Sequence, residues 1–113
     1  MLNSAFEELF EEFLLEARER VDDVEEALLA LEITPSIAER KAHLAQAKRQ
    51  LHTLKGNSGM MGFGELQRLS HALEDEVEGL DLEQPTIAPL LTGLDQLRRE
   101  LANITAPTGE PTP

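Results

Sequence analysis

Residues 6–31 read FEELFEEFLLEARERVDDVEEALLAL, and their apolar side chains recur at spacings of three and four. Because an α-helix has 3.6 residues per turn, side chains at these spacings lie on one face. The apolar face consists of Phe6, Phe10, Phe13, Ala17, Val21, Val24, Leu28 and Leu31. The stretch predicts one long amphipathic helix, which must bury this face against other elements.

A second helix is predicted after Thr34-Pro35, where the pattern breaks. Ser36, followed three residues later by Glu39, forms the sequence signature of a capping box at its start. Its expected core positions are Ile37, Leu44, Ala47, Leu51, Leu54, Ser58 and Met61.

Two further helices follow. Gly62 and Gly64 mark a break, and residues 81–84 form the next turn. The third helix repeats the apolar residues Leu66, Leu69, Leu73, Val77 and Leu80. Pro85 and Pro89 lie at or near the start of the fourth, where proline is tolerated. The apolar face of this fourth helix comprises Ile87, Leu90, Leu94, Leu97, Leu101 and Ile104.

Four amphipathic helices joined by short loops predict an all-α fold, an antiparallel up-down-up-down four-helix bundle over residues 1–104. Residues 105–113 are rich in proline and threonine and supply no core residues. They are expected to form either a linker to something longer or a loose natural terminus.

The composition excludes several classes of protein. The chain has 113 residues, which predicts one domain, and its net charge of −12 disfavours binding to nucleic acid or to anionic membranes. It has no cysteine, and its acidic N-terminus resembles neither a signal peptide nor a membrane span. A soluble, cytoplasmic protein, monomeric as an isolated domain, is expected.

The second predicted helix is basic within this acidic chain. Its cationic residues are Arg40, Lys41, Lys48, Arg49 and Lys55, against the single acid Glu39. They form either a solvated face that complements the acidic first and third helices or a surface for an acidic partner.

His52 is expected to face outward, because the core positions of its helix lie to one side of it. Its surface neighbours are small or cationic: Ala45, Lys48, Lys55, Gly56 and Gly59. Two glycines late in a helix each cost about 1 kcal/mol relative to alanine. They mark either a fraying helix end or a place where another protein approaches closely.

An exposed imidazole with a lysine one turn away is suited to carrying a phosphoryl group. The neutral ring offers a nucleophilic nitrogen near pH 7, and the ammonium offsets phosphoryl charge. The ordinary alternative is a surface histidine without a function.

Three stretches carry a family resemblance: HTLKGNSGMMGF at residues 52–63, FLLEARERVDDVEEALLALE at 13–32 and LSHALED at 69–75. Together they resemble histidine phosphotransfer (Hpt) domains, and are most similar to the N-terminal Hpt domain of CheA-type chemotaxis histidine kinases. The resemblance covers nearly the whole of the predicted bundle.

The resemblance implies a role for each matching residue. His52 would accept a phosphoryl group from the ATP-binding domain of a histidine kinase and pass it to an aspartate of a response-regulator receiver. Lys55 would lie beside the phosphoryl group, and Glu74 would hydrogen-bond the imidazole with His71 next to it. Gly56 and Gly59 would leave room for docking partners.

Lys48, on the basic helix, is predicted to help dock the acidic pocket of a receiver. The resemblance also implies that the domain is not an enzyme on its own and binds no cofactor. ATP and Mg²⁺ would be used by the partner kinase domain, because the chain has no phosphate-binding G-x-x-x-x-G-K-[ST] loop.

A helical bundle could also serve two other functions. A di-iron site needs Glu-x-x-His, but arginine precedes each of His43, His52 and His71 by three residues, so no metal site is predicted. The remaining alternative is a structural or dimerising bundle that associates through the apolar face of its first helix.

Overall fold

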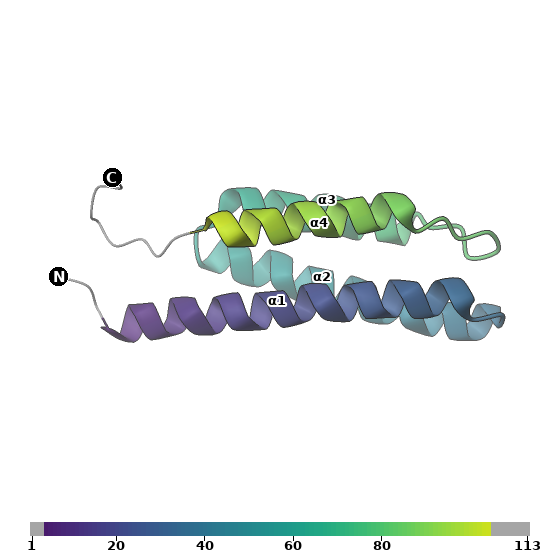
Figure 1. The fold of residues 1–113 in the computed structure, drawn as a ribbon, viewed down its shortest axis with the longest axis horizontal. Helices are drawn as coiled ribbons and strands as arrows, with labels where there is room; N and C mark the ends of the chain where they lie inside the picture. Colours follow the sequence, from purple (N-terminus) through teal and green to yellow (C-terminus); the bar gives the residue numbers. More distant parts are fainter. Residues whose placement is uncertain (1–3, 105–113) are drawn as a thin grey trace.

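The computed structural model describes residues 4–104 as four antiparallel helices. They are α1 (Ser4–Ile33), α2 (Ile37–Met60), α3 (Gly64–Glu78) and α4 (Ala88–Asn103). Figure 1 shows α1 and α2 as the two long members, with α3 and α4 lying side by side along them. The predicted tail, residues 105–113, lies outside the described residues.

The helices close into a ring of neighbours. Each helix packs against those before and after it in the chain, and α4 returns to pack against α1. Short connections between sequential helices produce this arrangement. The predicted all-α, up-down-up-down bundle is confirmed.

The core is built from the predicted apolar faces. Its largest fully buried apolar side chains are Leu28, Leu31, Leu51, Leu54, Leu66, Leu94, Leu97, Leu101, Val21, Val24 and Val77. Other predicted core positions are only half-buried, and these are Phe6, Leu44, Met61, Leu69, Leu80 and Ile104. Such positions lie nearer the rim of the bundle, where fewer side chains surround them.

One predicted core residue is wrong, and two buried residues were not predicted. Ile37 is 39% exposed, because it is the first residue of α2 and lies at an open end of the bundle. Ala27 and Ser70 are buried, although neither was expected in the core. The Ser70 hydroxyl donates to the Leu66 carbonyl, so its burial leaves no unsatisfied group.

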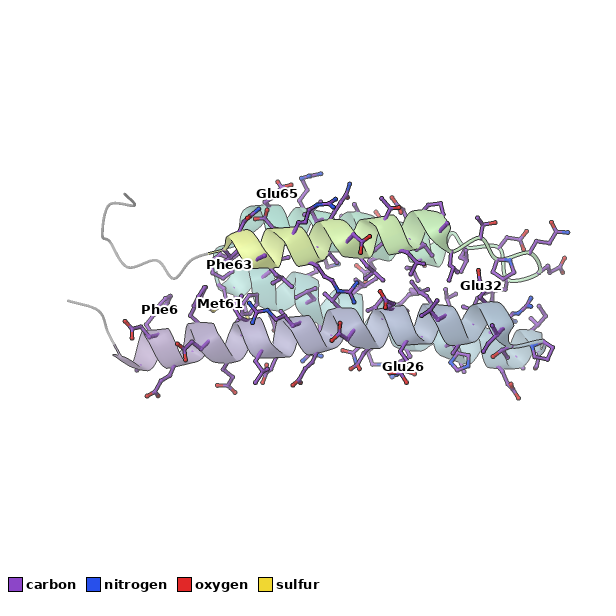
Figure 2. The ribbon with its side chains drawn as sticks, viewed as in Figure 1. Phe6, Glu26, Glu32, Met61, Phe63 and Glu65 are labelled. Atoms are coloured by element: carbon purple, nitrogen blue, oxygen red, sulfur yellow. The ribbon has the colours of Figure 1, made fainter. Side chains whose placement is uncertain are left out.

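The turn between α2 and α3 fixes how these two helices face each other. Gly62 has φ of +82°, a conformation that favours glycine, which confirms the predicted break. Phe63 then packs its ring against Phe10 and Phe13 of α1, with ring centroids 5.8 and 5.4 Å apart. Phe63 lies at the end of the bundle where α1 begins (Figure 2). This anchored turn brings the middle of α3 alongside the middle of α2.

At the opposite end of the bundle, Arg40 joins two loops. Its guanidinium donates to the carbonyl oxygens of Thr34 at 2.6 Å, Leu82 at 2.5 Å and Glu83 at 3.4 Å. The first carbonyl belongs to the α1–α2 connection and the other two to the α3–α4 connection. A single α2 side chain therefore ties both connections together.

Arg40→Ala is expected to lower the free energy of unfolding by about 1–3 kcal/mol, because charge-assisted hydrogen bonds to three carbonyls are lost together. Urea unfolding followed by circular dichroism measures the change. Lys41→Ala is the matched control, because the exposed Lys41 side chain has no polar partner among residues 4–104. An equal loss in both variants would contradict a specific role for Arg40.

Candidate functional site

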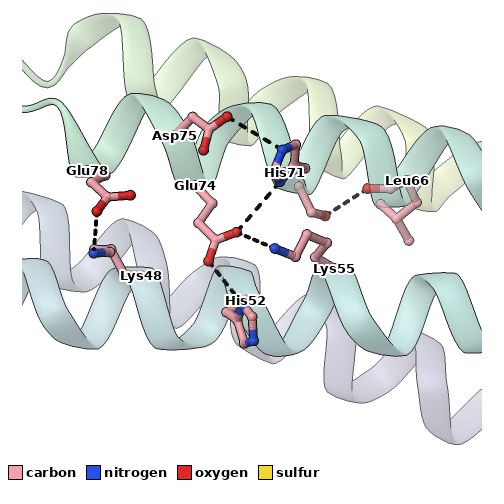
Figure 3. Close-up of polar contacts among 9 residues, drawn as sticks. Lys48, His52, Lys55, Leu66, His71, Glu74, Asp75 and Glu78 are labelled. Atoms are coloured by element: carbon pink, nitrogen blue, oxygen red, sulfur yellow. Dashed lines mark hydrogen bonds and ion pairs between the residues drawn. The ribbon is translucent and has the colours of Figure 1, made fainter.

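His52 lies on an exposed face of α2 next to α3, and 70% of its side chain is accessible to solvent. Its ring atom Nδ1 is 3.1 Å from Oε2 of Glu74, which is on α3. Figure 3 shows the imidazole held under the Glu74 carboxylate, with the second ring nitrogen pointing away from α3. The outward orientation predicted from the helical periodicity is confirmed.

Glu74 is the centre of the site. Its other oxygen, Oε1, accepts a hydrogen bond from Nζ of Lys55 at 2.8 Å, and only 13% of the Glu74 side chain is exposed. Partial burial raises the pKa of Glu74, but the hydrogen bonds and charges of Lys55 and His52 outweigh it and hold the pKa below its ordinary value. Glu74 is therefore ionised at neutral pH.

The ionised carboxylate decides the tautomer of His52. A carboxylate can only accept hydrogen bonds, so Nδ1 of a neutral imidazole must carry the proton and donate it to Glu74. The lone pair is then on Nε2, the nitrogen that faces solvent. The site thus presents a fixed, accessible nucleophile on a helix surface.

A second histidine lies beyond this pair. His71 Nδ1 is 3.9 Å from Glu74 Oε1, and its Nε2 is 3.6 Å from Asp75 Oδ2. Both separations are too long for hydrogen bonds and are charge contacts only when His71 is protonated. The structure therefore places His71 beside Glu74, without making it part of the hydrogen-bonded set.

Comparison with known proteins agrees with this geometry. The family model of the Hpt domain matches residues 8–105. The chain belongs to the Hpt domain family. This membership supports a role as a phosphoryl carrier in two-component signalling.

The curated relatives are chemotaxis proteins. The chain is 33% identical to the chemotaxis protein CheA of Halobacterium salinarum over 92% of its own length and 16% of the relative's. It is 31% identical to the CheA of Treponema pallidum, over 88% of the chain and 13% of the relative. The Hpt domain therefore spans less than a fifth of the length of these relatives. No solved structure is significantly similar to it.

The two glycines of α2 have different surroundings in this Hpt domain. A Cβ at Gly56 would meet nothing within 4 Å, so its face is open. A Cβ at Gly59 would lie 2.6 Å from the side-chain nitrogen of Gln67 on α3. Because this nitrogen is at the far end of an exposed, flexible side chain, Gln67 can move to admit a methyl group, and the domain itself does not require glycine at position 59.

Two of the five cationic side chains of α2 pair with acids of α3. Lys48 Nζ lies 3.3 Å from Glu78 Oε1, and Lys55 pairs with Glu74. For these two lysines the structure supports the first alternative from the sequence, a cationic face that complements an acidic helix. Sequence reasoning missed Glu78, which was one of several acids on the third helix.

Two negative observations hold for residues 4–104. No group of three or more His, Asp or Glu side chains there is arranged to hold a metal ion. Within the same range, no helix is long and apolar enough to cross a membrane.

Proposed function

We propose that this Hpt domain carries a phosphoryl group on Nε2 of His52, between a CheA-like histidine kinase and an aspartate of a response-regulator receiver. The observation that carries the proposal is the 3.1 Å contact between His52 Nδ1 and Glu74, which leaves Nε2 free and exposed. Family membership supplies the class of reaction.

The geometry fits both halves of a carrier cycle. In the first, the Nε2 lone pair attacks the γ-phosphorus of ATP, the N–P bond forms, and the bond from phosphorus to the ADP oxygen breaks. The ring keeps its Nδ1 proton and becomes positively charged, which the Glu74 carboxylate stabilises. In the second, an aspartate oxygen attacks phosphorus, the N–P bond breaks and neutral imidazole returns.

The remaining chemistry is assigned to the partners. ATP and Mg²⁺ would be bound by the kinase, because residues 1–113 contain no G-x-x-x-x-G-K-[ST] loop. In this proposal the domain is a substrate and carrier rather than an enzyme, and works in the cytoplasm as part of a chemotaxis kinase.

The direct test mixes the domain with ATP, Mg²⁺ and the ATP-binding core of a CheA-like kinase. We expect protein-bound phosphate that is labile in acid and stable in base, located by mass spectrometry on the peptide that contains His52. The control is phosphorylation of the kinase's own Hpt domain by the same core. No phosphate on this domain, with the control positive, would favour a structural or self-associating bundle.

Docking of the partners is proposed for the surface around His52. Gly56 is exposed and has open space above it, so a partner's backbone can approach His52 from that side. Lys48 remains a predicted docking residue, although its pairing with Glu78 partly offsets its charge. Gly59 is proposed as a second small residue of this surface, where only the flexible end of the exposed Gln67 side chain lies close by.

Gly56→Ala is expected to stabilise the fold and slow the transfer. Alanine in a helix interior is favoured over glycine by about 0.5–1 kcal/mol, and the new methyl group meets no atom of the domain. The same methyl group would obstruct an approaching partner. Thermal unfolding and the rate of phosphorylation by the kinase core measure the two effects. A more stable variant with an unchanged phosphorylation rate would show that Gly56 is not part of the docking surface.

A further inference from the structure

Most cationic side chains of the domain already have a partner within it. Those with hydrogen bonds or ion pairs are Arg20, Arg40, Lys48, Lys55, Arg68 and Arg98. Among residues 4–104, the side chains of Arg18, Lys41, Arg49 and Arg99 make no hydrogen bond or ion pair. Of these four, only Arg49 lies within one helical turn of His52.

Helix geometry places Arg49 on a different side of His52 from the two paired lysines. At 100° per residue, Lys48 and Lys55 are about 40–60° to one side of His52, and Arg49 and Gly56 about 40–60° to the other. The lysine side faces α3, because both lysines pair with α3 acids. Arg49 therefore lies on the side of His52 that is turned away from α3.

The orientation of the imidazole connects Nε2 with that side. Since Nδ1 is bonded to Glu74 on α3, Nε2 points away from α3 (Figure 3). Lys55 Nζ donates to Glu74 Oε1 at 2.8 Å and its side chain is only 24% exposed, so its charge is paired with the Glu74 carboxylate. A cation other than Lys55 is then available to offset the charge of a phosphoryl group on Nε2 only if it lies on the other side of His52.

Arg49 also lines open space beside the acceptor. A shallow hollow of about 310 Å³ is bounded by Ala45, Lys48, Arg49, His52 and Glu74. Within the hollow Ala45 presents only a methyl group, and outside it a Cβ at Gly56 would meet nothing within 4 Å, so there is space beside the His52 ring for a bulky anionic group. A guanidinium one turn away can donate two parallel hydrogen bonds to phosphoryl oxygens.

We propose that Arg49 binds the phosphoryl group carried on Nε2 of His52, and that Lys55 acts instead by holding Glu74. This inference rests on the proposed function for the identity of the carried group. It differs from the role that the family resemblance implies for Lys55.

The test uses phosphoramidate, a small phosphoryl donor without a protein surface. In this reaction the P–N bond of the donor breaks, ammonia leaves, and the bond from phosphorus to His52 Nε2 forms. The rate is followed by mass spectrometry on the His52 peptide of wild type, Arg49→Gln, Arg49→Lys and Lys41→Gln. Lys41→Gln is the matched control, because it removes the same charge from the same helix about three turns away.

We expect Arg49→Gln to slow labelling of His52 about three- to tenfold, Arg49→Lys to keep part of the rate, and Lys41→Gln to leave it within about twofold. Equal rates in Arg49→Gln and wild type would overturn the proposal. So would a defect seen only with the kinase core as donor, because Arg49 would then contact the partner protein rather than the phosphoryl group.

The same set of proteins separates this inference from the proposed function. Failure of the kinase core to phosphorylate wild type would count against the proposed function, while the phosphoramidate rates would still report on Arg49. Circular dichroism of each variant confirms that a slower rate does not come from loss of fold.

Discussion

His52→Gln is expected to abolish phosphorylation by the kinase core and to leave the melting temperature within about 2 °C of wild type. Glutamine has no nucleophilic ring nitrogen, so the N–P bond cannot form. The fold should tolerate the change, because 70% of the His52 side chain is exposed and, among residues 4–104, its one polar contact is with Glu74. Acid-labile phosphate and thermal unfolding are measured on the same preparations.

His43→Gln is the matched control for this substitution. His43 is on the same helix, is half-buried, and its side chain has no polar partner among the described residues. The His43→Gln variant should be phosphorylated on His52 at the wild-type rate. Persistent labelling of the His52→Gln variant would show that another residue accepts the phosphoryl group. A large loss of stability in this variant would show that His52 has a structural role.

Glu74→Gln is expected to slow phosphorylation about 10- to 100-fold. The amide oxygen can still accept the Nδ1 hydrogen, so the imidazole keeps its orientation, but the negative charge that stabilises the phosphorylated ring is lost. Lys55 also loses the partner that it contacts at 2.8 Å. Single-turnover phosphorylation at saturating ATP isolates the chemical step.

Glu78→Gln provides the comparison. It removes the same charge from α3 one turn further on and breaks the contact with Lys48, but it leaves the imidazole untouched. Its single-turnover rate should stay within about threefold of wild type. If the two variants slowed the reaction equally, the general acidity of α3 would matter and the bond between Glu74 and His52 would not.

Much of the fold is predictable because the apolar residues of each helix recur with helical periodicity, which identifies the face that is buried. The spacing in residues 6–31 predicts α1, and Val21, Val24, Leu28 and Leu31 are all fully buried. Ile37 shows the limit of this reasoning, since periodicity identifies a face but not where along the bundle that face stops being covered. The contacts of Arg40 with two loops join residues more than 40 positions apart, which no local pattern reports.

The site also has one feature that the sequence predicts and one that depends on tertiary contacts. The exposure of His52 follows from helical geometry alone, because its own helix defines the core side. Its pairing with Glu74 depends on the register of α3 against α2, which the turn at Gly62 and the packing of Phe63 set through tertiary contacts. Before the structure, only the family resemblance implied that pairing. The resemblance implied a place beside the phosphoryl group for Lys55, and only the structure showed its contact with Glu74.

The exposure of His52 has a consequence for timing. Nothing described in the domain closes over a helix surface from which 70% of the imidazole reaches solvent, so water has the same access to a phosphorylated ring as a partner does. The lifetime of the charged state is then a competition between spontaneous hydrolysis and the arrival of the next protein. In the proposed carrier role, the duration of the signal would depend on how the concentration and docking rate of the partners compare with the rate of that hydrolysis.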